Sequence, residues 1–284
     1  MTAVAIVTGA SRGAGRGIAI ALGSHGCTVY VTGRSDSSSD TGMPGTIHET
    51  AAAVTAAGGK GVAIRCDHAD DAQVQALFDR VARDASRLDI LVNNACAIQD
   101  ALHAPGQFWE KPLSLSQMID VGVRSSYVAS WHAARAMVRQ GSGLIAFTSS
   151  PGSVHYCMGP AYGAHKAGLD KLAADMAVDL RDTGVSAISV WMGALASERL
   201  LAMIEADPQK YGHLPAILEP TEYTGQIIWA LSQDPELTSF SGQTLIGAEL
   251  GRRYGITRQD GSFPPSARDT HGVEPRIQYP LIIR

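Results

Sequence analysis

Short runs of apolar and β-branched residues alternate along this chain with segments in which apolar residues recur every three to four positions. Runs of this kind, bounded by glycine and polar residues, are typical of strands that are buried on both faces of a sheet. They lie at residues 3–8, 28–32, 61–65, 88–92, 143–148, 185–191 and 243–246. The remaining periodic segments predict helices with one apolar face. They cover roughly residues 18–22, 47–57, 72–85, 114–140, 161–182 and 221–231.

Strands and helices alternate from the first residues onward, which predicts a parallel sheet with helices on both faces. The expected fold is a single-domain, Rossmann-like α/β structure with a doubly wound sheet in three layers. We expect this domain over residues 1–250 and a proline-containing C-terminal extension over residues 251–284. Ligands of such sheets bind at the carboxyl ends of the strands, so the segments that follow the strands are the ones to inspect for chemistry.

A glycine-rich turn follows the first predicted strand, with the spacing Gly-x-x-x-Gly-x-Gly. Glycine allows positive φ and a close approach of the backbone to a ligand. The next helix begins with unpaired N–H groups and the positive end of its dipole, where a pyrophosphate binds well. Because the turn joins a strand to a helix, it predicts a dinucleotide site. The expected contacts are Gly9, Ser11, Arg12, Gly13, Ala14 and Gly15.

The second predicted strand ends in Gly33 and Arg34, where dinucleotide folds place the residue that contacts the adenosine ribose. An acidic residue there binds the 2′-hydroxyl group, whereas an arginine accommodates a 2′-phosphate. Arg12 adds a second cation on the same side. We therefore predict NADP(H) as the favoured cofactor and NAD(H) as the alternative, should both arginines be merely solvated. The polar, aperiodic residues 35–46 predict an inserted loop beside this end of the cofactor.

Tyr162 and Lys166 stand four positions apart in a predicted helix and therefore share one face of it. A nearby ammonium group favours the phenolate, which would make the tyrosine a stronger acid at neutral pH. The spacing also occurs by chance on exposed helices, so the pair gains its meaning from the rest of the chain. Ser150, at the end of a predicted strand, provides a third polar group.

Taken together, these motifs resemble those of the short-chain dehydrogenase/reductase family in order and spacing. The resemblance covers roughly residues 3–250 and includes Thr8–Gly15, Asp67, Asn93–Ala95 and the pair of Tyr162 and Lys166. A closer likeness to one subgroup of the family comes from Gly33–Arg34, Ser149–Ser153, Lys171–Asp175 and Trp191. The resemblance implies an oxidoreductase with a nicotinamide dinucleotide cofactor.

The resemblance also implies roles for individual residues. Ser150 would hold the substrate oxygen, with Ser149 as the alternative because the family spacing is commonly one residue longer. Tyr162 would exchange the proton with that oxygen, and Lys166 would lower the pKa of the tyrosine and bind the nicotinamide ribose. Further cofactor contacts are implied for Asp67, Asn93, Ala95, Tyr162, Gly193 and Ser197.

Two positions depart from the family pattern. Gly122 stands where the family usually carries an asparagine that supports a water chain to the lysine; a water molecule, Asn94 or Asp120 could take over that task. Met192 and Gly193 replace the usual Pro-Gly after the sixth strand. These departures motivate a rival hypothesis, namely a non-catalytic dinucleotide sensor or scaffold on the same fold.

The expected activity is the NADP(H)-dependent reduction of a ketone or aldehyde, or the reverse oxidation of an alcohol, with Tyr162 as general acid or base. The alternative enzyme is an NAD-linked alcohol dehydrogenase. Residues 198–218 resemble the mobile segment that covers the substrate in this family. A hydrophobic carbonyl compound is favoured, with candidate substrate contacts at Phe108, Trp109, His155, Met192 and Leu195. For Phe108 and Trp109, packing of their loop onto the domain is an equal alternative.

Composition narrows the choice of partner and compartment. The chain has 284 residues, of which 45% are hydrophobic and 18% charged, and a formal net charge of −4. A negative charge without a basic run argues against nucleic acid or an anionic membrane as a partner. The four cysteines and nine histidines lack the spacing of a disulfide framework or a metal site. With no signal peptide and no apolar stretch of membrane length, a cytoplasmic enzyme is expected.

Small residues line the predicted helix over 161–182, among them Ala164, Ala167, Ala173 and Ala177. Such a surface suits close helix packing between subunits, so we expect a homodimer or homotetramer. A role of these residues in the core alone is equally compatible.

Overall fold

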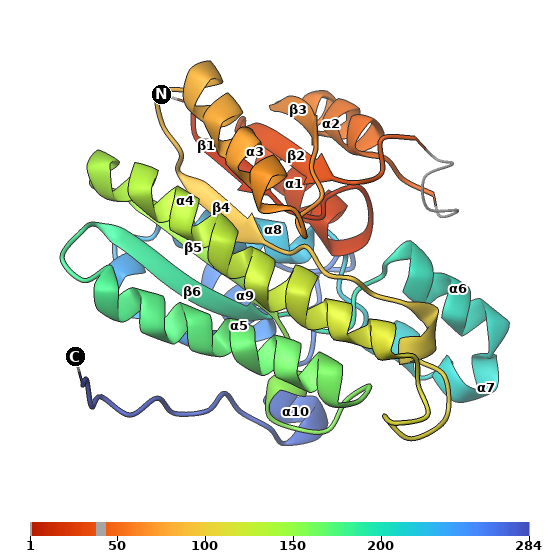
Figure 1. The fold of residues 1–284 in the computed structure, drawn as a ribbon. Coiled ribbons are helices and arrows are strands. Elements are labelled where there is room, and N and C mark those ends of the chain that lie inside the picture. Colours follow the sequence, from red (N-terminus) through yellow and green to blue (C-terminus); the bar gives the residue numbers. More distant parts are fainter. Residues whose placement is uncertain (1, 38–43, 284) are drawn as a thin grey trace.

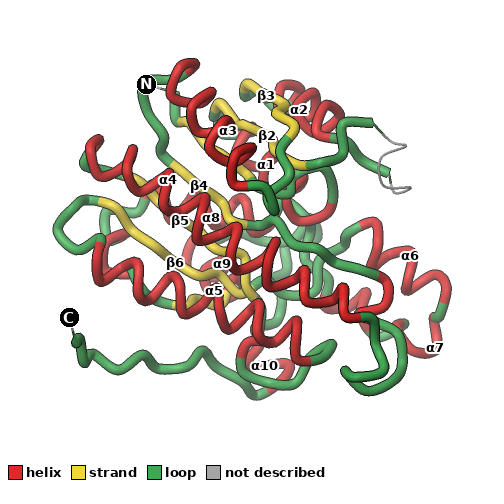
Figure 2. Tube along the Cα trace, in the orientation of Figure 1, coloured by secondary structure: helices red, strands yellow, loops and turns green. Residues whose placement is uncertain are grey.

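The computed structural model describes residues 2–37 and 44–283. It contains one parallel sheet of seven strands in the order β3-β2-β1-β4-β5-β6-β7, with helices on both faces (Figures 1 and 2). The strands are β1 (Val4–Val7), β2 (Thr28–Gly33), β3 (Lys60–Arg65), β4 (Ile90–Asn93), β5 (Gly143–Ser149), β6 (Val185–Trp191) and β7 (Thr244–Ile246). The predicted doubly wound α/β fold is confirmed. Part of the polar loop expected at residues 35–46 lies outside the described residues.

The helices form two layers that cover opposite faces of the sheet. One layer consists of α1 (Gly13–Ser24), α2 (Ile47–Ala56), α8 (Tyr223–Gln233) and α9 (Gly247–Tyr254). The other consists of α3 (Asp71–Asp84), α4 (Ser125–Gln140) and α5 (Pro160–Asp179). Two shorter helices, α6 (Glu198–Ala206) and α7 (Pro208–Tyr211), project from one end of the molecule, and α10 (Ala267–His271) lies near the start of α5 (Figure 1).

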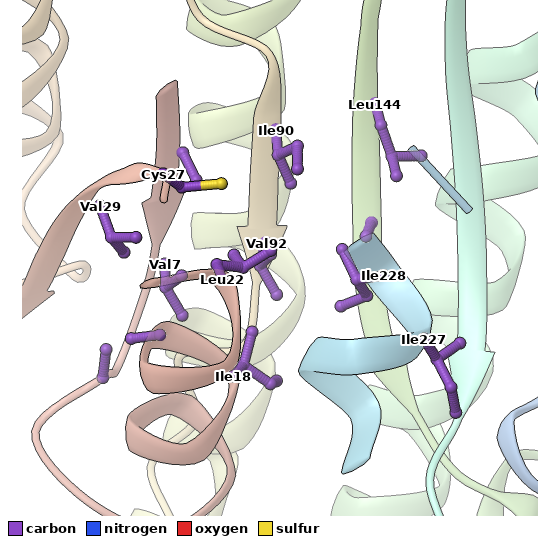
Figure 3. Packing of buried hydrophobic residues seen from close by; sticks show 14 of the residues in the cluster. Val7, Ile18, Leu22, Cys27, Val29, Ile90, Val92, Leu144, Ile227 and Ile228 are labelled. Atoms are coloured by element: carbon purple, nitrogen blue, oxygen red, sulfur yellow. The ribbon is translucent and has the colours of Figure 1, made fainter. Parts of the chain in front are cut away.

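The central strands are largely apolar because each face of the sheet borders a separate core, whereas the edge strand β3 is only partly buried and begins and ends with charged residues. In β1, Ala5 and Val7 pack in the core beneath α1 and α8, whereas Val4 and Ile6 pack beneath α3 and α4. Side chains alternate between the two faces of a strand, so burial on both faces produces an unbroken apolar run. Figure 3 shows the first of these cores, where Ile18 of α1 lies near Val92 of β4.

The helix predicted over 114–140 is divided into three parts. A 3₁₀ turn (Leu113–Ser116) and a π-helical segment (Met118–Arg124) precede α4. The N-cap residue of α4 is Arg124. π-Helical turns are frequent at functional sites, and this one contains Gly122.

The expected domain boundary at residue 250 falls inside α9, and Leu250 itself belongs to the core. Beyond α10 the chain runs as an extended tail along α5 (Figure 1), where Gln278, Tyr279 and Pro280 line a hollow together with residues of that helix. Within residues 2–37 and 44–283, no helix has the length and apolar character needed to cross a membrane. In the same ranges, no three His, Cys, Asp or Glu side chains gather in a way that could hold a metal ion.

Candidate active site

A cavity of about 660 Å³ opens at the carboxyl ends of the strands, where the strand order reverses between β1 and β4. Its volume lies in the range of small-molecule sites, about 300 to 1,000 Å³. The residues predicted from the sequence that line it are Gly9, Ser11, Arg12, Gly13, Ala14, Gly15, Arg34, Asp67, Ala95, Tyr162, Lys166, Met192, Leu195 and Ser197. The topology thus brings together segments that are far apart in the sequence.

The glycine turn between β1 and α1 requires bare backbone at two of its positions. Gly9 has a φ of +63°, and a Cβ there would lie 2.7 Å from Cα of Ala95. A Cβ on Gly15 would lie 2.3 Å from the carbonyl oxygen of Gly9 and 2.5 Å from Nδ2 of Asn94. That Nδ2 donates to the carbonyl oxygens of Thr8 and Gly9, at 2.9 and 3.1 Å, and so holds the turn in place. The backbone at the start of α1 therefore lines the cavity without side chains, as the binding of a pyrophosphate requires.

Two arginines line the cavity beside the end of β2. The guanidinium group of Arg12 donates to Oγ of Ser35 at 3.0 Å and to the carbonyl oxygens of Pro44 and Gly45 at 2.9 Å. Arg34 is exposed and also lines the cavity. This is the position where the sequence predicts the adenosine ribose, and two cations and a hydroxyl group lie there together.

Tyr162, Ser150 and Lys166 meet where β5 ends and α5 begins. The hydroxyl oxygens of Ser150 and Tyr162 are 2.8 Å apart. Nζ of Lys166 donates to the carbonyl oxygen of Thr148 at 2.9 Å and lies 5.6 Å from the centre of the Tyr162 ring. Ser149 is fully buried, and its hydroxyl group donates to the carbonyl oxygen of Lys166. The structure therefore places Ser150, rather than Ser149, beside the phenol.

The pKa of Tyr162 does not follow the expectation from the sequence. Burial raises the pKa of the phenol, while the hydrogen bond with Ser150 acts in the opposite direction and is the smaller effect. Burial also lowers the pKa of Lys166, whose ammonium group donates to a backbone carbonyl and not to the phenol. The net shift is therefore upward, because the loss of water around the phenol outweighs the lowering expected from the charge of Lys166. The phenol is protonated at neutral pH, which is the form that can donate a proton.

Three of the candidate substrate residues lie outside the cavity. Phe108 and Trp109 are 63% and 69% exposed and pack edge to face on each other. His155 stacks on His271 of α10, with 5.6 Å between the ring centres. None of the three is among the residues that line the cavity, whereas Met192 and Leu195 are. Phe108 and Trp109 are thus not part of the cavity wall, and their high exposure shows that they are not buried against the domain either.

Two of the residues expected to contact the cofactor do not line the cavity and form hydrogen bonds within the protein instead. The side-chain amide of Asn93 is buried and donates to Oγ of Ser130 on α4 at 2.9 Å; it is Asn94 that lines the cavity. Gly193 does not line the cavity either, and its N–H group donates to Oε2 of Glu219 at 3.1 Å.

Glu219 joins the two ends of the segment that follows β6. Its N–H group donates to the carbonyl oxygen of Ala194 at 2.7 Å, and its own carbonyl oxygen accepts from the N–H group of Ala196 at 2.9 Å. Leu195 and Glu219 also form a parallel bridge. Burial raises the pKa of Glu219 to about 7. Residues 195–218, which include α6 and α7, therefore form a loop tied at both ends, and we call it the covering segment.

The covering segment makes two charged contacts that sequence reasoning missed. A carboxylate oxygen of Glu198 accepts a hydrogen bond from the N–H group of Gly13, at the start of α1, at 3.0 Å. Arg199 pairs with Asp100, from the loop that follows β4. An acidic residue in the first turn of a helix ordinarily indicates only the start of that helix, so no local signal connected Glu198 with Gly13. The other lining residues that were not predicted include Cys66, His68, Cys96, Ile98, Gln99, Val121 and Thr148.

Comparisons with known proteins agree with this geometry. The chain matches the family model of short chain dehydrogenases over residues 3–207. It is 42% identical over 269 residues to human dehydrogenase/reductase SDR family member 1, covering 91% of this chain and 83% of that protein. Among solved structures, a putative dehydrogenase from Xanthomonas campestris has a TM-score of 0.76 and 27% identity over 92% of both chains. A mutant short-chain dehydrogenase/reductase from Serratia marcescens has a TM-score of 0.72 and 31% identity, covering 86% of this chain and 95% of that one.

Fold, site and comparisons therefore lead to the same assignment. The chain belongs to the short-chain dehydrogenase/reductase family of oxidoreductases, which use a nicotinamide dinucleotide, and within it to the group around dehydrogenase/reductase SDR family member 1.

Proposed function

We propose that this chain is an NADP(H)-dependent reductase of a ketone or aldehyde, able to oxidise the corresponding alcohol in reverse. The observation that carries the proposal is the 2.8 Å contact between the hydroxyl groups of Ser150 and Tyr162 beside the cavity. A protonated phenol that shares a hydrogen bond with a serine can donate its proton to a carbonyl oxygen held between the two groups.

In this proposal the residues of the chain act by binding and by proton transfer. The N–H groups of the glycine turn would hold the pyrophosphate, and Arg12 and Arg34 the 2′-phosphate. Asp67 and Ala95 would contact the adenosine part, and Ser197 the nicotinamide part. The dinucleotide, when bound, supplies the hydride.

The proton would move from Oη of Tyr162 to the substrate oxygen as negative charge develops there. Ser150 would donate a hydrogen bond to the same oxygen and thereby orient the substrate. Lys166 would stabilise the phenolate that remains after proton transfer. Met192 and Leu195 give the cavity an apolar wall beside these groups, which supports a hydrophobic carbonyl compound as substrate. The use of NADP(H) would favour reduction as the direction in cells, and the protonated phenol is the form that donates the proton in that direction.

The cofactor preference is tested by the variant Arg34→Ala. We expect it to weaken the binding of NADPH by about tenfold to a hundredfold, because a charge-assisted hydrogen bond contributes about 1.5 to 3 kcal/mol. The binding of NADH should change by less than about twofold. Both affinities are measured by titrating protein fluorescence. Arg83→Ala, which removes an exposed arginine of α3 outside the cavity, is the control. Tighter binding of NADH than of NADPH by the wild type would favour the NAD-linked alternative.

Glu198 offers a second test of where the phosphates bind. Its carboxylate group occupies the N–H group of Gly13, so it would compete with, and repel, a pyrophosphate at the start of α1. We expect Glu198→Gln to tighten the binding of NADPH by about two- to fivefold, the usual effect of one charge at a helix terminus. Glu205→Gln, near the other end of α6, is the matched control. Weaker binding by Glu198→Gln would place the pyrophosphate elsewhere.

The rival hypothesis of a sensor differs from the enzyme in one measurable respect. A sensor binds the dinucleotide without consuming it, whereas the proposed reductase consumes NADPH when a suitable carbonyl compound is added. A panel of hydrophobic ketones and aldehydes, with the alcohol product identified in each case, separates the two. Binding without turnover across the whole panel would favour the sensor.

A further inference from the structure

His165 is buried beside Tyr162 and Lys166 and has no part in the proposed reaction. It lies on α5, directly before Lys166, and is 2% exposed. Its Nδ1 is 3.5 Å from Sγ of Cys96, which lines the cavity at the end of β4. Burial and the neighbouring ammonium group of Lys166 lower the pKa of the imidazole to about 2, so the ring is uncharged at neutral pH.

The other side of the imidazole packs on bare backbone. A Cβ on Gly122, in the π-helical segment, would lie 2.4 Å from Cδ2 and 2.5 Å from Nε2 of His165. Non-bonded carbon atoms do not approach each other so closely. The backbone of Gly122 has no positive φ, so the need for glycine there is one of space and not of conformation. Positions 122 and 165 are thus complementary: a side chain at one excludes the ring at the other.

The two elements also touch one helical turn further along. A Cβ on Gly168 would lie 3.0 Å from Cγ2 of Val123. Two glycines, one on each element, therefore let α5 and the π-helical segment approach closely, and the imidazole of His165 provides the three atoms nearest to a Cβ on Gly122. It separates this segment from Cys96 at the end of β4.

We infer that His165 is a positioning residue, whose imidazole fills the space left by Gly122 and fixes Lys166 and Tyr162 relative to the ends of β4 and β5. The inference deepens the proposed function and rests on it, because Lys166 and Tyr162 are its catalytic groups. It also accounts for the glycine at position 122, where the family usually carries an asparagine. The space for that side chain is occupied from the opposite helix.

The uncharged state of the imidazole also suits its position next to Lys166. A cation at position 165 would stand next to the ammonium group of Lys166, and like charges at close range destabilise each other. An imidazole can still accept a hydrogen bond from the thiol of Cys96, which an apolar side chain of the same size could not.

The experiment is a double-mutant cycle between positions 122 and 165, read out by thermal unfolding and by kcat and KM. We expect His165→Ala to lower kcat by about tenfold to a hundredfold, because a displacement of about 1 Å at a reacting group has effects of this size. The KM for NADPH should change by less than about twofold. Gly122→Asn should lower both kcat and the melting temperature. The double variant should recover most of the loss of Gly122→Asn, because the amide then occupies the vacated space.

A role in stability alone would not change the pH dependence of kcat. We expect His165→Ala to shift the pH profile of kcat, since the surroundings of Lys166 change, and His165→Asn, which retains an acceptor for Cys96, to restore the profile in part. His132→Ala, on α4 and stacked on Phe78 away from the cavity, is the control, which should keep kcat and its pH profile.

The outcomes separate this inference from the proposed function. Wild-type kcat and pH profile in His165→Ala would overturn the positioning role while leaving the reductase intact. An unimpaired Gly122→Asn, or a double variant no better than Gly122→Asn, would overturn the packing argument. The unfolding measurements need no substrate, so they test the complementarity of the two positions even if no carbonyl compound is turned over. If His165→Ala does not fold, kcat and its pH profile are measured in His165→Asn. The effect of Gly122→Asn on kcat and on the melting temperature then tests the packing argument.

Discussion

Replacing Tyr162 by phenylalanine is expected to lower kcat for a carbonyl substrate by about a hundredfold to ten-thousandfold, the range attributed to one general acid. The substitution removes only the hydroxyl group that contacts Ser150. The ring keeps its packing against the backbone of Gly152, where a Cβ would lie 2.5 Å from Cε1 of Tyr162. The loss of the proton donor lowers kcat. Because the shape of the site is kept, the binding of NADPH should stay close to that of the wild type.

The measurement compares kcat and NADPH affinity in the wild type and in Tyr162→Phe. Tyr127→Phe, which alters a half-exposed tyrosine on α4 outside the cavity, is the matched control and should behave as the wild type. Full turnover by Tyr162→Phe would remove the tyrosine from the role of acid, whatever the cofactor.

The substitution Lys166→Met should have opposite effects on activity and on stability near neutral pH. We expect kcat to fall by about a hundredfold to a thousandfold, the usual loss when one charge-stabilising donor is removed. Methionine matches the apolar stem of lysine without its charge, so the cost of burying an ammonium group that is only 7% exposed disappears. Against this stands the lost hydrogen bond to the carbonyl oxygen of Thr148, which costs about 1 kcal/mol.

The pH dependence of stability makes the second effect measurable. Burial lowers the pKa of Lys166 in the folded protein below its ordinary value of 10.5. Between the lowered pKa and 10.5, the unfolded chain binds more protons at this site than the folded protein, so the free energy of unfolding rises with pH. Below that window the full cost of burying the charge is present, and above it the cost is absent.

Urea unfolding of the wild type and of Lys166→Met across this pH range tests whether the free energy of unfolding of the wild type rises with pH relative to that of the variant. The advantage of Lys166→Met should be greatest at the lower pH and shrink as the pH rises through the window. Lys171→Met, which removes an exposed lysine of the same helix that pairs with Asp175, is the control and should show no such trend. A constant difference between wild type and Lys166→Met would mean that folding does not lower the pKa of Lys166.

The fold could be predicted because each of its causes is local in the sequence. Strands buried on both faces are unbroken apolar runs, and a strand, a glycine turn and a helix in succession fix the start of a dinucleotide site. The carboxyl ends of parallel strands then bring Gly9, Arg34, Asp67 and Ala95 to one cavity without any knowledge of side-chain contacts.

The features that escaped prediction depend on contacts between distant segments. The division of the helix over 114–140 accompanies the packing of Gly122 against His165, and periodicity carries no sign of such a contact. The contact of Glu198 with Gly13 joins residues that are 185 positions apart. The pKa of Tyr162 is raised by burial, which the spacing between Tyr162 and Lys166 does not reveal.

Transfer of the hydride to a carbonyl compound is the most direct test of the proposed reduction. NADPH carrying deuterium at the transferring position of the nicotinamide is incubated with the protein and the panel of hydrophobic ketones and aldehydes, and the alcohols are examined by mass spectrometry. We predict an alcohol with one deuterium on its carbinol carbon, formed by the wild type and largely absent with Tyr162→Phe. Tight binding of NADPH without labelled alcohol from any carbonyl compound would contradict the assignment as a reductase.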